Sequence, residues 1–181
     1  MVGPIRNMKE LKTEKKARSA KELAYTAVFV AFLIGAQLVL SVIPGVEIVT
    51  VSFVVYGYVF GYRRGMVAAT SFSLLRQFVF GFFPNVLILY LIYYNFLVCL
   101  FGWLGVKKEN RLPVIVVTAC FCTIAFSMLD NLLTPLLYGY SLKMAKYYFF
   151  ASLPFAIPQT ICVAITVALL FLPIKKIFLS L

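Results

Sequence analysis

The sequence contains no histidine and only six acidic residues, which leaves little for metal binding or acid–base catalysis. Histidine is the commonest metal ligand and the commonest general acid or base in proteins. At or inside the apolar stretches the acids are Glu47 and Asp130. A Gly-rich phosphate loop of the Walker type is also missing, so the chain does not hydrolyse ATP by that chemistry. We therefore expect no enzymatic activity, metal or cofactor, and an intramembrane protease or lipid transferase is a weak rival.

Charged residues are scarce, at 13% of the chain against about a quarter in ordinary soluble domains. Hydrophobic residues make up 63%, and several apolar runs reach the roughly 20 residues that cross a bilayer as a helix. Lipid offers no partners to backbone polar groups, so continuous apolar runs without alternation favour helices. The four cysteines lie within these runs, where we expect them to be buried and apolar. The fold class predicted is an all-α integral membrane bundle.

Turn signals such as Pro44-Gly45 and Pro84 divide the apolar sequence into six segments. We expect residues 1–21 to form a basic cytoplasmic segment and residues 22–181 to form one substrate-binding domain. Its six transmembrane helices are expected at residues 22–43, 46–61, 66–83, 85–106, 112–138 and 149–177. A basic start also suits a signal peptide, but the first apolar run is too long for one, which indicates a retained helix.

The basic residues behind the net charge of +11 are concentrated at the ends and in the short connections, which argues against nucleic acid as a partner. Cytoplasmic loops of membrane proteins carry an excess of Lys and Arg. With the N-terminus inside, 14 of the 17 basic residues lie on the cytoplasmic side, and only Lys143 and Lys146 lie outside. Arg76 falls within a helix. Both termini are therefore expected in the cytoplasm of a multi-pass protein of the cell membrane.

Polar side chains within the apolar helices collect in their outward halves, whereas the inward halves are almost purely apolar. Such residues are costly in lipid and invite a functional interpretation. At about 1.5 Å per residue, Arg76 lies roughly 10 Å below the outer end of its helix. Aromatic walls with a few convergent polar groups are typical of small-molecule pockets. The predicted substrate-binding residues are Glu47, Arg76, Asn85, Tyr90, Tyr94, Asn95, Asp130, Asn131 and Gln159.

Structural roles are the alternative for the same residues. Arg76 and Asp130 also suit an intramembrane ion pair, and Asn and Gln side chains also suit hydrogen bonds between helices. Tyrosines near a boundary also form the interfacial belt of membrane proteins. The one-sided depth of the whole set favours a cavity open to the outside.

Small residues form a stripe along one face of the first helix, at Ala24, Ala27, Ala31 and Gly35. Small side chains let another helix approach closely in lipid. These four are the predicted partner-docking residues, with internal packing as the alternative. Gly57, Gly61 and Gly65 repeat the pattern in the second helix.

Several segments in this order resemble a known family of membrane proteins. They are the step Ala27-x-x-x-Ala31, the stretches at residues 44–50, 59–65 and 147–155, and the ending at residues 169–178. Together they make the chain similar to the substrate-binding S component of energy-coupling factor transporters, which import vitamins and related micronutrients into prokaryotes. Many members carry a His and an Asn early in the last helix, where this chain has Gln159 and Val163.

The resemblance implies a ligand held near the external surface by the fourth to sixth helices and the loop after the first. It also implies a transmembrane coupling subunit, which contacts the alanine stripe, and two cytoplasmic ATPase subunits. The chain would then bind its solute from outside and reorient against the coupling subunit. A stand-alone carrier or channel is the main rival, although a conducting path needs polar lining at both faces. A purely structural membrane subunit also stays open.

Overall fold

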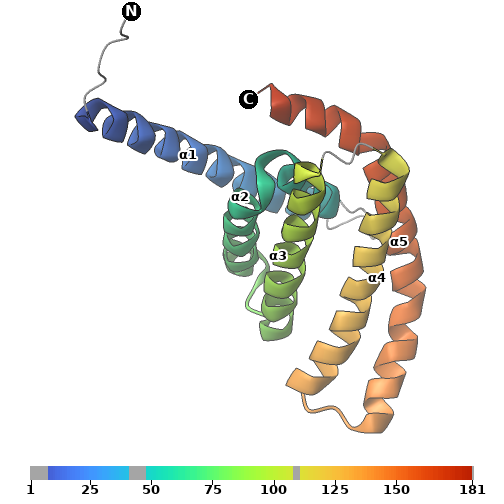
Figure 1. Ribbon diagram of the computed structural model, residues 1–181. Helices are drawn as coiled ribbons and strands as arrows, with labels where there is room; N and C mark the ends of the chain where they lie inside the picture. The colour runs from blue at the N-terminus through green and yellow to red at the C-terminus, as the bar shows by residue number, and fades with distance from the viewer. Residues whose placement is uncertain (1–7, 41–47, 108–110, 181) are drawn as a thin grey trace, which may run out of the picture.

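The computed structural model describes residues 8–40, 48–107 and 111–180, with side chains from residue 19 onward. Within these ranges the regular elements are five α-helices: α1 (Met8–Leu40), α2 (Ile48–Phe80), α3 (Pro84–Val106), α4 (Leu112–Leu137) and α5 (Leu142–Leu179). The predicted all-α class is confirmed. In Figure 1, α1, α2 and α3 form one group, and α4 and α5 run beside each other as a long hairpin.

Four stretches of the described chain are long and apolar enough to cross a membrane: Ser19–Leu40, Pro84–Val106, Leu112–Leu137 and Leu142–Leu179. This agrees with the predicted membrane protein. At about 1.5 Å per residue, the 38 residues of α5 extend to roughly 57 Å, well beyond the roughly 30 Å hydrocarbon core. Figure 1 shows that α5 bends before its C-terminal end. Pro154, Pro158 and Pro173 lie inside it, and proline is a common cause of helix bends.

The second and third expected helices form the single element α2, which is interrupted at Gly61. Gly61 has φ 81° and ψ 170°, a non-helical conformation that is essentially restricted to glycine. The break separates a first arm, residues 48–60, from a second arm, residues 62–80. We expected a turn over residues 62–65, but the helix resumes directly after Gly61, since one glycine in this conformation is enough to redirect the chain.

The two arms of α2 close around α3. A Cβ atom added at Gly57 would lie 3.0 Å from the Val98 Cα atom. A Cβ atom added at Gly65 would lie 2.8 Å from the Val98 Cβ atom. Residues eight apart in a straight helix are about 12 Å apart along the axis, so both meet Val98 because the chain folds back at Gly61. A Cβ atom at Gly105 would lie 2.2 Å from the Tyr58 carbonyl oxygen. Gly57 and Gly65 of the predicted glycine pattern therefore serve internal packing, whereas Gly61 serves the turn.

The core draws on all five helices, and between α1, α2 and α3 it is rich in aromatic rings. Phe53 packs against Phe29, Phe72 and Tyr94 with ring centroids 4.8 to 5.7 Å apart. Tyr56 is 4% exposed, stacks on Phe29 at 4.2 Å and shares a hydrogen bond with Thr26. Tyr56 therefore belongs to the core, although its sequence position also suited an interfacial belt.

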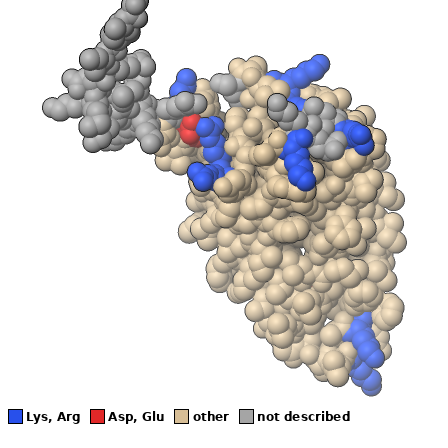
Figure 2. All heavy atoms as spheres, in the orientation of Figure 1, with Lys and Arg blue, Asp and Glu red and all other residues tan. Residues whose placement is uncertain are grey.

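Basic side chains gather at the two ends of the molecule, and the surface between them carries almost none in the view of Figure 2. We call one end the basic end; it carries Arg63, Arg64, Lys107, Arg111, Lys175 and Lys176. Lys143 and Lys146 mark the opposite end, at the turn between α4 and α5. An uncharged band between two charged ends is the pattern expected of a bundle that crosses a bilayer.

Helix boundaries follow the prediction closely in α3 and α4 and depart from it elsewhere. Pro84 and Pro113 occupy the first turns of α3 and α4, where a missing backbone N–H costs nothing. The helix α1 begins at Met8 rather than at residue 22, inside the predicted N-terminal segment. The helix α5 begins at Leu142 rather than at residue 149, and its N-cap Ser141 accepts a hydrogen bond from the Met144 amide.

Candidate functional site

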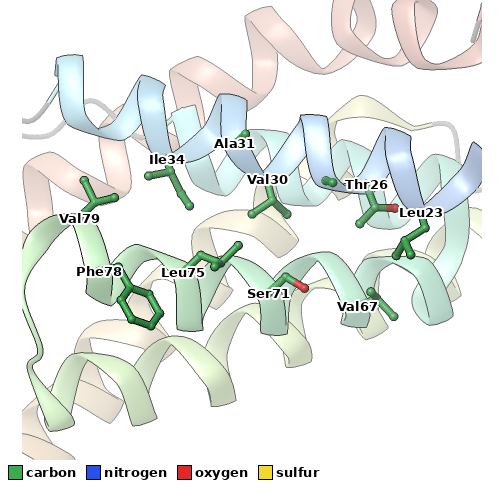
Figure 3. A pocket seen from close by; sticks show the side chains of 11 residues that line it. Leu23, Thr26, Val30, Ala31, Ile34, Val67, Ser71, Leu75, Phe78 and Val79 are labelled. Carbon is green, nitrogen blue, oxygen red and sulfur yellow. The ribbon is translucent and has the colours of Figure 1, made fainter.

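Most of the predicted substrate-binding residues lie toward the opposite end, where α2 meets α3 and α4 meets α5. Arg76 is four residues before the end of α2, and Asn85 is the second residue of α3. Asp130 and Asn131 lie in the last third of α4. The helices α1 and the second arm of α2 run in the same direction (Figure 3), so the C-terminal part of α1 also reaches this end.

Arg76 is the centre of one polar network, which joins α1, α2 and α3. Its Nε atom donates a hydrogen bond to the Gln37 Oε1 atom at 3.1 Å, and the Gln37 Nε2 atom lies 3.4 Å from the Tyr90 hydroxyl. The guanidinium carbon lies 4.5 Å from the Phe80 ring centroid and 4.8 Å from that of Tyr90. Two aromatic faces thus stabilise a positive charge that is half-buried in an apolar bundle.

Asp130 is the centre of a second network, which joins α3, α4 and α5. Its two carboxyl oxygens accept hydrogen bonds from the Thr134 hydroxyl at 2.7 Å and the Tyr148 hydroxyl at 2.8 Å. Thr134 in turn accepts a hydrogen bond from the Asn85 amide at 3.2 Å. The Tyr138 hydroxyl donates to the Asn85 carbonyl at 3.1 Å. Both carboxyl oxygens of Asp130 are therefore occupied.

Aromatic rings lie between the two networks. Tyr90, which contacts Arg76, also packs against Phe126 of α4 with centroids 6.1 Å apart. Phe126 is one helical turn before Asp130, a separation of about 6 Å along the axis. Tyr94 is buried beneath Tyr90, edge-to-face at 5.0 Å. Tyr90 of α3 therefore contacts both Arg76 and an aromatic ring of α4 that lies one turn from Asp130.

Two of the predicted site residues carry a buried polar atom that is not satisfied. The Arg76 Nη1 atom and the Asn131 Oδ1 atom are buried and have no hydrogen-bond partner among the described residues. One is a donor and the other an acceptor. More than nine in ten buried polar groups in proteins are hydrogen-bonded, so each exception calls for an explanation, such as a water or a ligand.

Asn95 and Gln159 are not brought together with these networks. The Asn95 amide group pairs with the Thr70 hydroxyl at 3.2 Å and donates to the Leu91 carbonyl at 2.8 Å. This is the structural role that the sequence left open for Asn side chains. Gln159 is half-buried and precedes Thr160, whose carbonyl accepts a contact from the Cys120 thiol. Cys120 precedes Asp130 by ten residues, so this part of α5 is about 15 Å from Asp130 along the axis.

The structure also shows whether Arg76 and Asp130 form an ion pair. Their hydrogen bonds run to different residues on different helices, so the alternative of an intramembrane Arg76–Asp130 pair is wrong. Within the described residues, the acid that pairs with an arginine is Glu22, which contacts Arg64. Glu47 lies outside the described residues.

Three hollows that the structure describes all lie along α1. The largest, about 520 Å³, lies between α1 and the second arm of α2 (Figure 3). A second, of about 370 Å³, lies between α1, the first arm of α2 and the end of α5, and a third, of about 280 Å³, lies near Arg63 and Arg64. None of these three is lined by a predicted substrate-binding residue, whereas Ala27 and Ala31 line the largest.

The predicted docking stripe lies on the surface. Ala24, Ala27, Ala31 and Gly35 are all exposed, and a Cβ atom added at Gly35 would meet no atom within 4 Å. Internal packing, the alternative for this stripe, does not account for it in the described chain. The surface is available to a lipid or to another membrane helix.

Sequence reasoning missed three residues that bond to predicted site residues: Gln37, Thr70 and Tyr148. Gln37 is the one carboxamide in the apolar run of the first helix, and the cost of polar groups in lipid is the signal that singles it out. Thr70 and Tyr148 carry no such signal, because isolated hydroxyls are common in membrane helices. Their roles follow only from the contacts.

Among the described residues, no group of three or more Cys, Asp and Glu side chains is placed to bind a metal ion. Searches against protein families, curated proteins and solved structures find no match to this chain.

Proposed function

We propose that the chain is a membrane-embedded binding subunit for a small polar solute. The observation that carries the proposal is the pair of buried, unsatisfied atoms in Arg76 and Asn131. A buried polar group left without a partner costs about 1–3 kcal/mol, and more when it is charged. A bound solute that accepts a hydrogen bond from Arg76 and donates one to Asn131 would recover that cost. A zwitterion, or a ring with both donor and acceptor groups, meets this requirement.

The surrounding contacts favour a specific site over a general water channel. The guanidinium group of Arg76 is fixed by Gln37 on one edge and by the Phe80 and Tyr90 rings. Preorganised donors of this kind bind with a small loss of conformational freedom. The Tyr90 ring beside the cation also suits a planar ligand.

In this proposal the two arms of α2 count as separate spans, which gives six spans with both ends of the chain in the cytoplasm. The excess of Lys and Arg at the basic end supports a cytoplasmic location for that end. Arg76 and Asn131 then lie in the outer half, where an external solute reaches them first.

The resemblance to S components of energy-coupling factor transporters extends the proposal to partners. The subunit would hand its vitamin-like solute over by reorienting against a transmembrane coupling subunit, while two separate ATPase subunits hydrolyse ATP. The exposed stripe of Ala24, Ala27, Ala31 and Gly35 supports a docking role. The cell membrane of a prokaryote is the corresponding location.

The decisive experiment measures thermal stabilisation of the purified chain across a panel of vitamins, nucleobases and amino acids. A ligand that binds only the folded state raises the melting temperature. For the ligand found, we expect Asn131→Leu and Arg76→Gln each to weaken binding by about 5- to 150-fold, as loss of one buried hydrogen bond implies. The matched control is Asn95→Leu, which makes the same change at an amide already paired with Thr70.

Two results would count against the proposal. If no compound stabilises the chain, or if Asn95→Leu weakens binding as much as Asn131→Leu, the unsatisfied atoms do not mark the site. If liposomes that contain the chain alone accumulate the solute down its gradient, the protein is a stand-alone carrier instead of a capture subunit.

A further inference from the structure

The largest of these three hollows is an apolar groove on α1. Its walls are Val30 and Ile34 on one side and Leu75 and Val79 of the second arm of α2 on the other (Figure 3). Ala27 and Ala31 keep the groove open because their side chains are short. The hydroxyl of Thr26, which also lines it, is already bonded to Tyr56 and to the Glu22 carbonyl. Apart from this hydroxyl and that of Ser71 the side chains that line the groove are apolar, so an apolar solute or chain is the suitable occupant.

The length of the groove matches half of a bilayer. From Leu23 to Ile34 it follows α1 for 11 residue steps, or roughly 16 Å. The hydrocarbon core of a bilayer is about 30 Å thick, so one leaflet contributes about 15 Å. The groove begins near Arg63 and Arg64 at the basic end. Its length accommodates one acyl chain of the leaflet on that side of the membrane.

The mouth of the groove is positively charged. Leu23, Thr26 and Val67 line both the groove and the hollow of about 280 Å³ near Arg63 and Arg64, so the two spaces are adjacent. Glu22 neutralises Arg64. Arg63 has no carboxylate partner in the described part of the chain; its Nε atom donates to the Tyr62 hydroxyl at 3.1 Å. Among the described residues, Arg63 is therefore a positive charge beside the mouth that no carboxylate neutralises.

We propose that this groove and its mouth bind one anionic phospholipid. The acyl chain lies between α1 and the second arm of α2, and the phosphate contacts Arg63. Arginine suits this role because its remaining N–H groups match phosphate oxygens. The positive charge of Arg63 complements the negative charge of a phosphodiester such as phosphatidylglycerol. An apolar helix in the groove would offer no anion to Arg63, so the charge favours the lipid. The docking role proposed above for Ala27 and Ala31 then requires the lipid to leave before a coupling subunit binds.

Native mass spectrometry of the full chain tests the proposal, in detergent micelles that contain equal amounts of phosphatidylglycerol and phosphatidylcholine. We expect one retained lipid per chain, with phosphatidylglycerol preferred. Arg63→Gln should lower that preference about fivefold, the effect of one arginine at an anionic lipid surface. Ala31→Phe should abolish retention by filling the groove.

Two matched variants serve as controls. Lys176→Gln removes an exposed positive charge from the same end without touching the groove, and Val39→Phe adds a ring to α1 beyond it. Both should retain phosphatidylglycerol as the unchanged chain does. Circular dichroism of each variant confirms that the helices are intact.

Three outcomes would overturn the inference. Equal retention of the two lipids by the unchanged chain would remove the role of charge. Equal loss in Arg63→Gln and Lys176→Gln would show a general surface effect. A dimer of the chain that disappears in Ala31→Phe, with no lipid bound, would identify a second copy as the occupant. The result does not depend on the solute or on the proposed transport function.

Discussion

At the scale of single residues, the hydrogen bonds to Asp130 connect three helices. Tyr148 of α5 and Thr134 of α4 each occupy one carboxyl oxygen, and Asn85 of α3 bonds to Thr134. Side-chain hydrogen bonds between membrane helices average about 0.6 kcal/mol and reach about 1.7 kcal/mol. At this strength the network orients the ends of the helices, while packing in the core supplies most of the stability.

Removal of one hydroxyl tests this estimate. Tyr148→Phe deletes the 2.8 Å hydrogen bond to Asp130 and should lower the free energy of unfolding by about 1 kcal/mol. The control is the neighbouring Tyr147→Phe, at a side chain that is 72% exposed. Both are measured by equilibrium unfolding in mixed micelles of dodecyl maltoside and dodecyl sulfate. Equal free energies of unfolding for the two variants would show that the Tyr148–Asp130 hydrogen bond contributes nothing to stability.

The sequence predicted the depth of the polar residues but not their partners. Arg76, Asn85 and Asp130 lie at one end of the bundle because helical rise converts position into depth. Which side chains meet depends on contacts between distant segments, such as Arg76 with Gln37, 39 residues apart. Spacing alone therefore left the Arg76–Asp130 pair open, and the contacts excluded it.

At the scale of elements, the break at Gly61 shapes the bundle. It turns α2 back so that both arms contact Val98 of α3. It also places Arg63 and Arg64 together at the basic end, directly after the turn. A residue with a Cβ atom is strained in this conformation by about 1–3 kcal/mol.

Two glycines of the same chain should respond to alanine in opposite directions. Gly61→Ala should lower the melting temperature, because its φ of 81° is unfavourable for alanine. Gly35→Ala should leave stability unchanged or raise it, because Gly35 lies inside α1, has open space around it, and alanine favours helices by about 1 kcal/mol. Thermal unfolding followed by circular dichroism compares the two. A Gly61→Ala protein as stable as the original would contradict the assigned conformation.

Helix ends were predictable where the sequence contains a local stop signal. The starts of α3 and α4 follow Phe83 and Arg111, and a proline comes in the first turn of each. The start of α5 was missed because Lys143 and Lys146 make its first turns polar, although Ser141 caps the helix. The sequence predicted two helices where the structure has the single element α2. Hydrophobicity does not show that one glycine can take the place of a four-residue turn.

At the scale of the whole molecule, charge distinguishes the two ends. The basic end carries Arg63, Arg64 and the C-terminal lysines of α5, whereas Lys143 and Lys146 stand at the opposite end. All-helical architecture and membrane character followed from composition, because few charges and long apolar runs leave no soluble alternative. Orientation rests on the distribution of Lys and Arg.

Cysteine labelling measures this orientation. In a background in which the four native cysteines are replaced by alanine, Ser141→Cys and Ser180→Cys place exposed thiols at the two ends. A membrane-impermeant maleimide applied to intact cells should label the first variant directly and the second only after permeabilisation. The reverse pattern, or equal labelling of both, would contradict a cytoplasmic basic end.

The prolines of α5 have a mechanical consequence. Proline donates no backbone hydrogen bond, so the carbonyls four residues before Pro154, Pro158 and Pro173 lose their usual intrahelical donors. Bending α5 at these steps therefore breaks fewer bonds than bending α3, which has no proline after its first turn. Tyr148, which touches Asp130, and Phe178, which touches Tyr56, lie on either side of them. We therefore expect a displacement of one end of α5 to bend the helix at these prolines, so that little of it reaches the other end.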